Sequence, residues 1–286
     1  MLSPMAIRIG AHISSAGGVE KAAERAHALG CQALQIFTAS PRQWRAAPVP
    51  AAKAEALRAL RRSYQLGPLV VHANYLINLA GSNPEFHRRS LTAFRGELER
   101  AAAIGADYLV LHPGSGPLGR CLESLRQAAE GFAWGSLTLL IENTAGGGAH
   151  LGGDFGAVAA LLDGLAGLPV GACIDTCHAW VAGYDLVSPA GYQATLQQLD
   201  ELVGLARVPV FHANDAKAER GSHRDRHEHI GAGQLGRAVF RRLLRDPRLR
   251  GKAFILETPV DGPDDQARDL AALRQLGPPN PKPRRR

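Results

Sequence analysis

Short apolar segments alternate along the chain with longer segments in which apolar residues recur every three or four positions. The first kind is typical of a buried strand and the second of an amphipathic helix. The pair repeats along the whole chain, with strands expected at 6–12, 33–38, 68–72, 107–112, 137–142, 169–175, 208–212 and 253–257. Helices are expected at 18–29, 84–105, 118–132, 188–206 and 263–276. Three more are expected: one that follows the loop at 40–45 and ends at 66, one that begins at 154 and a short one after 233. Such strand–helix repeats predict an α/β fold, a TIM (β/α)8 barrel in a single domain.

An open, doubly wound parallel sheet is the alternative arrangement of the same units. Such a sheet commonly carries a glycine-rich phosphate-binding turn after its first strand. Residues 12–18 read HISSAGG and do not match that turn. The polar stretch at 214–233 is expected to be a long loop after the seventh strand. The closed barrel is therefore the preferred prediction.

The composition is that of a globular protein with an unusual charge. The chain has 286 residues, 45% hydrophobic and 21% charged, which suits one barrel domain, expected at 6–277. The net charge of +7 favours a polyanionic partner, although a generally basic proteome would give the same excess. Residues 278–286 read PPNPKPRRR and are predicted to form a disordered basic tail.

The four cysteines are too few and too scattered to predict a disulfide framework. Cys173 and Cys177 flank Asp175, so a soft Cys/His metal site is one possibility and buried packing is the other. Residues 1–10 lack the apolar core of a signal peptide, and no apolar run reaches the roughly 20 residues of a membrane span. We therefore expect a cytoplasmic protein in a reducing compartment, without a membrane segment.

Polar residues end all eight predicted strands. In a parallel barrel the carboxyl ends of all strands meet at one rim, where active sites are built. Carboxylates that lie close together resist ionising unless a cation compensates them, and mixed imidazole and carboxylate ligands suit zinc, manganese or iron. A single histidine at a strand end is usually structural, but a ring of such residues predicts a metal centre. The strand ends are His12, Thr38, His72, His112, Glu142, Asp175, His212 and Glu257.

A second group of candidate ligands lies just outside this ring. His178 follows Asp175 by three residues. Asp225 and His227 are two residues apart, so in an extended segment their side chains point the same way. His178, Asp225 and His227 could hold one ion and leave a position open for water or substrate, as catalytic sites do. The plainer interpretation is that Asp175 caps a helix and His178 lies at the surface.

A series of short segments carries these residues. They are GAH at 10–12, FT at 37–38, RQWR at 42–45, HANYLIN at 72–78, HPG at 112–114, IENTAG at 141–146, DTCH at 175–178, HANDAK at 212–217, DRH at 225–227 and LET at 256–258. Together and in this order they resemble the endonuclease IV family of apurinic/apyrimidinic endonucleases. The resemblance covers the chain except its two termini, and its specificity lies in the combination. Ala73-Asn74 departs slightly from the family pattern and includes no expected ligand.

The resemblance implies a TIM-barrel enzyme with three divalent ions, Zn2+ in the first place and Mn2+ as the alternative. One ion would be bound by His72, His112 and Glu142. Glu142 would bridge it to a second ion, completed by Asp175, His212 and Glu257. The third ion would be bound by His178, Asp225 and His227. Glu142 and Glu257 are the implied catalytic residues.

The implied reaction is hydrolysis of the phosphodiester 5′ to an abasic site in duplex DNA, as in base excision repair. It would leave a 3′-hydroxyl and a 5′-deoxyribose phosphate, and removal of 3′-blocking groups is expected beside it. The resemblance assigns Arg42, Tyr75 and Leu76 to the DNA contact, and Arg226 adds charge where a phosphate backbone would lie. Without the resemblance, Tyr75 and Leu76 would be expected to begin a helix and pack locally. We expect the protein to act as a monomer.

Two other functions are compatible with parts of this pattern. A sugar isomerase or epimerase on a related barrel also gathers Glu, Asp and His around divalent ions. It needs neither Asp225 and His227 nor the basic and aromatic loop residues. A noncatalytic DNA-binding module with a structural metal is the second alternative, although structural zinc sites are normally closed and fully ligated by protein. The metal carried in the cell and any exonuclease activity stay open at this level.

Overall fold

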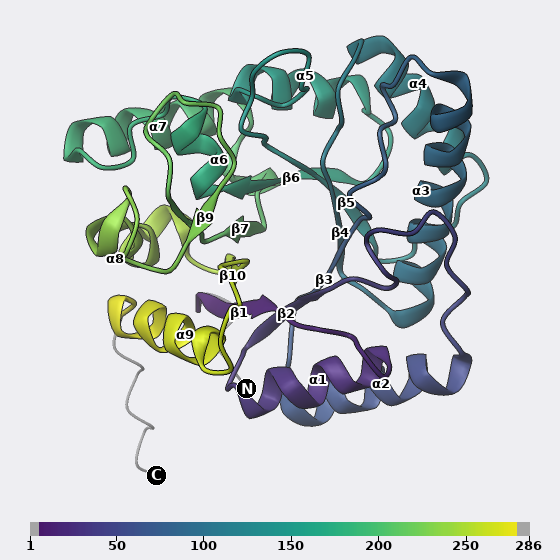
Figure 1. The fold of residues 1–286 in the computed structure, drawn as a ribbon, viewed down its shortest axis with the longest axis horizontal. Helices are drawn as coiled ribbons and strands as arrows, with labels where there is room; N and C mark the ends of the chain where they lie inside the picture. The colour runs from purple at the N-terminus through teal and green to yellow at the C-terminus, as the bar shows by residue number, and fades with distance from the viewer. Residues whose placement is uncertain (1–5, 279–286) are drawn as a thin grey trace.

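The protein is a closed parallel barrel surrounded by helices, as Figure 1 shows for the computed structural model, which describes residues 6–278. The eight barrel strands follow the order β1-β10-β7-β6-β5-β4-β3-β2, and each neighbouring pair is parallel. This arrangement confirms the predicted TIM barrel. The barrel strands are β1 Arg8–His12, β2 Ala33–Ile36, β3 Leu69–His72, β4 Tyr108–Leu111, β5 Thr138–Glu142, β6 Val170–Asp175, β7 Val210–His212 and β10 Ala253–Leu256.

The helices cover the outside of the barrel and begin and end where local chemistry favours it. The longest begins after Asn83, whose side chain accepts hydrogen bonds from the amides of Glu85 and Phe86, and it ends at Gly105 in the left-handed conformation. The helices are α1 Val19–Ala28, α2 Ala51–Tyr64, α3 Pro84–Ile104, α4 Leu118–Ala129, α5 Phe155–Gly164, α6 Thr176–Val181, α7 Pro189–Leu202, α8 Gly236–Arg245 and α9 Asp265–Leu276, with single 3-10 turns at Leu205–Arg207 and Pro247–Leu249.

Side chains alternate along each strand between the barrel interior and the surrounding helices. A small separate cluster of apolar side chains fills the interior, formed by Ala33, Val70, Val110, Leu140, Cys173, Val210, Ala253 and Ile255. Two positions further along each of these strands, the next inward-facing residue is polar. These residues are Gln35, His72, His112, Glu142, Asp175, His212 and Glu257. Because every second side chain of a strand points inward, a polar layer lies next to the apolar layer, at the carboxyl end of the barrel.

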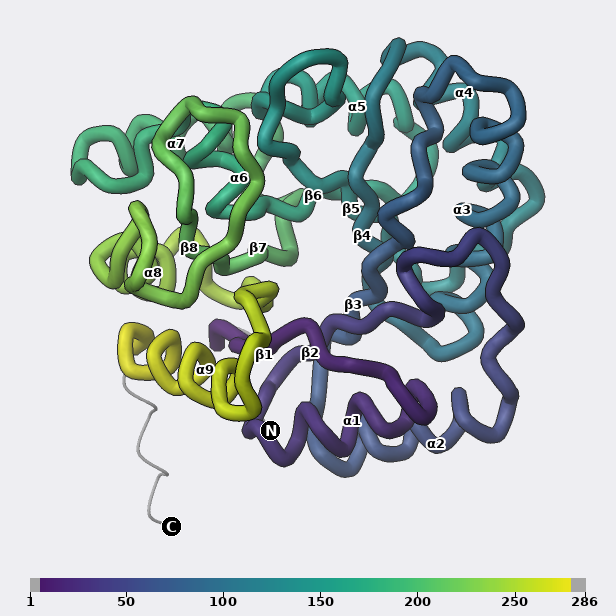
Figure 2. The backbone as a smooth tube through the Cα atoms, viewed as in Figure 1, coloured from purple at the N-terminus to yellow at the C-terminus, as the bar shows by residue number. Residues whose placement is uncertain are grey.

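Two elements at this end are absent from the predicted series of strands and helices. Residues 176–181 form the short helix α6, which only the helix-cap interpretation of Asp175 indicated. The expected long loop contains an antiparallel pair, β8 Asp215–Ala216 with β9 His227–Glu228. In the tube view this segment lies beside α6, between α7 and α8 (Figure 2). Within the described part of the chain, no helix is long and apolar enough to cross a membrane. The predicted disordered tail lies outside the described residues, apart from Pro278.

Candidate metal centre

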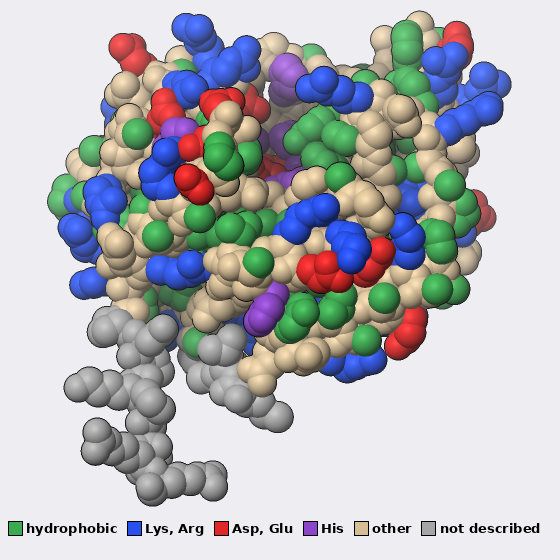
Figure 3. Space-filling view, turned by 60° about the horizontal axis from the view of Figure 1, so that its bottom comes forward, with side chains coloured by type: hydrophobic (Ala, Val, Ile, Leu, Met, Phe, Trp, Pro, Cys, Tyr) green, Lys and Arg blue, Asp and Glu red, His purple; other side chains and the backbone are tan. Residues whose placement is uncertain are grey.

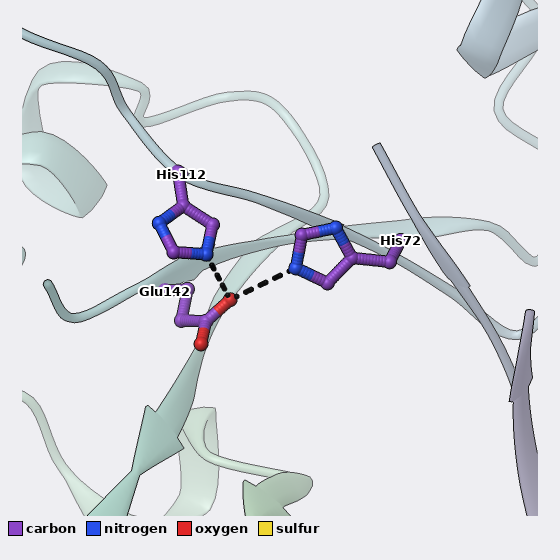
Figure 4. Close-up of side chains that lie close together, drawn as sticks. All are labelled: His72, His112 and Glu142. Carbon is purple, nitrogen blue, oxygen red and sulfur yellow. Dashed lines mark hydrogen bonds and ion pairs between the residues drawn. The ribbon is translucent and has the colours of Figure 1, made fainter. Parts of the chain in front are cut away.

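The first group of possible ligands joins three neighbouring strands. Glu142 ends β5, and its Oε2 atom lies 3.0 Å from Nε2 of His112 and 3.3 Å from Nε2 of His72 (Figure 4). The other ring nitrogen of His72, Nδ1, donates a hydrogen bond to the carbonyl oxygen of Ala73 at 2.8 Å. When the ring is neutral, Nε2 therefore carries no proton, and Nε2 is the atom that faces Glu142. Glu142 and His72 are buried, and His112 is one-third exposed, so the group opens towards the barrel mouth.

The second group shares Glu142 with the first. Nδ1 of His212 lies 2.9 Å from Glu142 Oε1, 3.2 Å from Glu257 Oε2 and 4.0 Å from Asp175 Oδ2. Ligand atoms of all four side chains lie within 4.8 Å of one another. Because Glu142 turns one oxygen to each group, its carboxylate is placed to bridge two cations.

The third group joins α6 to the β8–β9 segment. Asp225 lies between two imidazoles, with Oδ2 3.2 Å from His178 Nε2 and Oδ1 3.4 Å from His227 Nε2. The opposite nitrogens are held by backbone carbonyls, His178 Nδ1 on Asn143 at 2.9 Å and His227 Nδ1 on Glu257 at 3.0 Å. The two Nε2 atoms are buried and make no hydrogen bond within the described residues. Inward-facing, unpaired imidazole nitrogens beside a carboxylate fit a divalent ion.

Asp175 has two roles in this geometry. Its Oδ1 accepts a hydrogen bond from the amide of His178 at 2.8 Å and so caps α6. Its Oδ2 faces the second group and also accepts from the Asn214 side chain at 2.6 Å. The helix-cap interpretation and the ligand interpretation are therefore compatible. The plainer view of His178 as a surface residue is wrong, because its side chain is 2% exposed.

The buried charges strongly shift one another's pKa. Burial raises the pKa of Glu142, but neighbouring imidazoles outweigh it and hold this pKa well below its usual range. Burial lowers the pKa of His178, but the carboxylates of Asp175 and Asp225 outweigh it and hold the pKa well above its usual range. Burial also opposes ionisation of Asp225, yet His178 lowers its pKa to about 2. Protonated imidazoles thus balance the carboxylates, and divalent ions would take over that role.

The surroundings of the cysteines favour packing over metal binding, although Cys177, Asp175 and His227 lie close enough together to hold an ion. All four are buried and unpaired. Cys177 lies near Asp175 and His227, but its thiol donates weakly to the carbonyl oxygen of Arg226. Burial raises the pKa of Cys177, and a thiol binds metal as the thiolate. Packing is the better account of these residues.

Three amide side chains at the centre were not predicted. Asn143 links β5 to β6 through its hydrogen bonds with the backbone of Asp175, at 2.7 and 3.2 Å. Asn214 donates a hydrogen bond to the Asp175 carboxylate and adds no charge. Gln35 contacts His12, His212 and Glu257. The signal for Gln35 was a polar residue within an otherwise apolar strand, which the pattern alone did not separate from a surface position.

The predicted DNA-contact residues do not join the metal groups but surround them. Arg42 and Arg226 are exposed, Leu76 is half-buried, and Tyr75 is 62% exposed. Residues 75–76 form a turn and do not begin a helix. The Tyr75 ring lies 5.6 Å from that of His72, so it is close to the first group.

The loops that carry Arg42 and Tyr75 are tied together. Asn74, which is buried, donates its side-chain N–H to the carbonyl oxygen of Gln43 at 2.5 Å and accepts from the amide of Leu76 at 2.8 Å. In the space-filling view, histidine and acidic side chains line a hollow, and Lys and Arg side chains lie on both sides of it (Figure 3). A polyanion placed across the hollow would therefore meet positive charge at its edges.

Known proteins are similar in sequence to this chain over almost its whole length. The family model described as "Xylose isomerase-like TIM barrel" matches residues 23–276. A probable endonuclease 4 of Solibacter usitatus is 49% identical over 281 residues, which cover 94% of this chain and 97% of that protein. Endonuclease 4 of Thermus thermophilus is 45% identical, with 93% of this chain and 97% of that protein covered.

Solved structures give the same picture. The crystal structure of endonuclease IV from Thermus thermophilus has a TM-score of 0.87 at 43% identity and covers 94% of this chain and 98% of that chain. A D-tagatose 3-epimerase-like protein has a TM-score of 0.69 at 19% identity, with 94% and 96% covered. The second likeness concerns the fold alone.

Proposed function

Since this chain belongs to the endonuclease IV family, and is thus a DNA repair endonuclease, we propose that it hydrolyses the phosphodiester on the 5′ side of abasic sites in duplex DNA. The products would be a 3′-hydroxyl and a 5′-deoxyribose phosphate, and the same chemistry would remove 3′-blocking groups. One observation carries the proposal. Imidazole and carboxylate ligand atoms gather in three groups at the barrel mouth, and Glu142 belongs to two of them.

We propose that the three groups hold three divalent ions, Zn2+ first and Mn2+ as the alternative. Borderline ions accept mixed nitrogen and oxygen ligands, whereas Mg2+ prefers oxygen alone. When bound, such ions lower the pKa of water and neutralise charge on phosphate oxygens. The proposed ligands are His72, His112, Glu142, Asp175, His178, His212, Asp225, His227 and Glu257.

Glu142 and Glu257 are the proposed catalytic residues. Burial raises the pKa of both carboxyls, but the surrounding imidazoles outweigh it and keep both ionised at neutral pH. An ionised carboxylate accepts a hydrogen bond from water and so orients the water's lone pair towards an incoming phosphorus atom. Both side chains stand at the ends of parallel strands, which hold them in place while the substrate binds.

The loops above the barrel supply the proposed DNA contact. Tyr75 and Leu76 offer a planar and an apolar surface that could replace lost base stacking in a kinked duplex. An abasic nucleotide leaves the stack at little cost because it has no base to unstack. Arg42 and Arg226 are exposed and free to approach phosphates. The unpaired thiols agree with a reducing cytoplasm, where we expect the protein to act as a monomer.

The proposal is tested with a duplex that carries one tetrahydrofuran abasic analogue. Because this analogue cannot undergo β-elimination, nicking of its strand reports hydrolysis, and a polymerase should extend the resulting 3′-hydroxyl directly. A protein loaded with Zn2+ or Mn2+ that leaves this duplex intact would refute the substrate. Epimerisation of a ketohexose by the same preparation would instead favour the sugar-epimerase alternative, whose structural relatives are distant.

A further inference from the structure

A single uncharged side chain lies at the base of the second ligand group. Gln35 stands in β2, on the inward-facing side, and its side chain is fully buried. Its Nε2 atom lies 2.5 Å from Glu257 Oε1 and 3.0 Å from His12 Nδ1. Its Oε1 atom lies 2.8 Å from His212 Nε2. The amide thus contacts three side chains from three other positions on the rim.

The chemistry of these partners allows one orientation of the amide. An ionised carboxylate only accepts hydrogen bonds, so Glu257 must face the NH2 group of Gln35. The amide oxygen therefore faces His212, and this oxygen can only accept. It follows that His212 carries its proton on Nε2. In the neutral ring, which is the form that binds a metal ion, Nδ1 then has the free lone pair, and Nδ1 is the atom that faces Glu142, Glu257 and Asp175.

The other oriented imidazoles of the centre use the backbone for this purpose. His72, His178 and His227 each turn one ring nitrogen to a carbonyl oxygen. His212 uses a side chain from a strand 177 positions away in sequence. A backbone carbonyl is present whichever residue occupies its position, whereas the contact of His212 requires glutamine's amide at position 35. The orientation of His212 therefore depends on one side chain outside the ligand set.

We propose that Gln35 is a positioning residue for the second ligand group: it selects the His212 tautomer that leaves Nδ1 free and holds Glu257 towards the same point. The inference rests on the proposed function, since it assumes that this group binds a divalent ion. Leucine at position 35 would leave a buried ring N–H without an acceptor. Glutamate would keep the acceptor for His212 but set a second negative charge against Glu257.

The test compares Gln35→Leu and Gln35→Glu with wild type and with Gln198→Leu, a matched change at an exposed position on α7. Metal-depleted proteins are titrated with Zn2+ against a competing chelator, and bound metal is counted by elemental analysis. Loss of an outer partner of a metal-binding histidine typically weakens affinity by about 10–100-fold. We expect that loss for one ion per chain in both Gln35 variants, and added metal should restore nicking.

Two results would overturn the inference. The first is wild-type affinity for every ion in Gln35→Leu. The second is a drop in melting temperature with unchanged affinities, which would make Gln35 a packing residue. Gln35→Glu keeps the side-chain volume, so its Zn2+ affinity tests the inference even if the leucine variant does not fold. A wild-type protein that binds no divalent ion would overturn the proposed function as well, which separates the two failures.

Discussion

The central position of Glu142 predicts a large effect from removing its charge alone. Glu142→Gln keeps the shape of the side chain, but the carboxylate that faces both the first and the second group becomes neutral. Unit charges about 4 Å apart attract by about 4 kcal/mol at an effective dielectric constant of about 20. Because Glu142 is fully buried, solvent does not screen this interaction. An energy of about 4 kcal/mol corresponds to about 1000-fold in affinity.

Chelator competition measures this effect directly. Wild type, Glu142→Gln and Glu123→Gln, an exposed change on α4, are dialysed against increasing chelator, and their bound metal and nicking rate are followed together. We expect Glu142→Gln to lose two ions at a chelator concentration about 1000-fold lower than wild type requires. Its nicking activity should be lost together with these ions. If Glu142→Gln retained its ions beside the control and nicked within about tenfold of wild type, the bridging role would be refuted.

Three further predictions concern the loops and the charge balance. Replacing Tyr75 and Leu76 together by alanine should weaken binding of a lesion duplex by about 1–3 kcal/mol in fluorescence anisotropy, with metal content unchanged; loss of metal would show a structural role instead. Asn74→Ala removes the hydrogen bond that joins the loops carrying Arg42 and Tyr75 and should weaken the same binding by about 0.5–1.5 kcal/mol, whereas wild-type affinity would show that the loops are independent. In metal-free protein, His178 and His212 have pKa values well above the 6.5 of the unfolded chain. Their stabilisation is therefore present below about pH 6.5 and lost as the pH rises through the folded values, so the urea midpoint should fall with rising pH, and a rising midpoint would contradict the shifts.

The barrel and its ligand ring could be predicted because each rests on a local pattern. Buried strands and amphipathic helices differ in period, and each inward-facing strand end carries its polar residue two positions after an apolar one, as Val70 and His72 illustrate. The spacing of His178, Asp225 and His227 predicted one ligand set, whereas the division of the other ligands between two ions came from the family resemblance. The structure supplies the distances that give the sharing of Glu142 a physical basis.

The remaining features depend on contacts between distant positions. Gln35 meets Glu257 across 222 residues, and a lone polar residue in a strand does not indicate its partners. The strands β8 and β9 have two residues each, which is too short to show a period. Helix α6 was indicated only by the helix-cap interpretation of Asp175, because this residue both ends a strand and caps the helix. Such features can be identified only from the folded structure.

We propose that the side chains at the barrel mouth bind divalent ions and that the protein with these ions bound hydrolyses DNA at abasic sites. Counting bound metal and measuring nicking of a tetrahydrofuran duplex on one preparation tests both parts together. We predict about three Zn2+ or Mn2+ ions per chain, loss of nicking when they are removed, and its recovery when they are returned. A preparation that nicks this duplex with its ions removed, or that carries all its ions and leaves the duplex intact, would contradict the account.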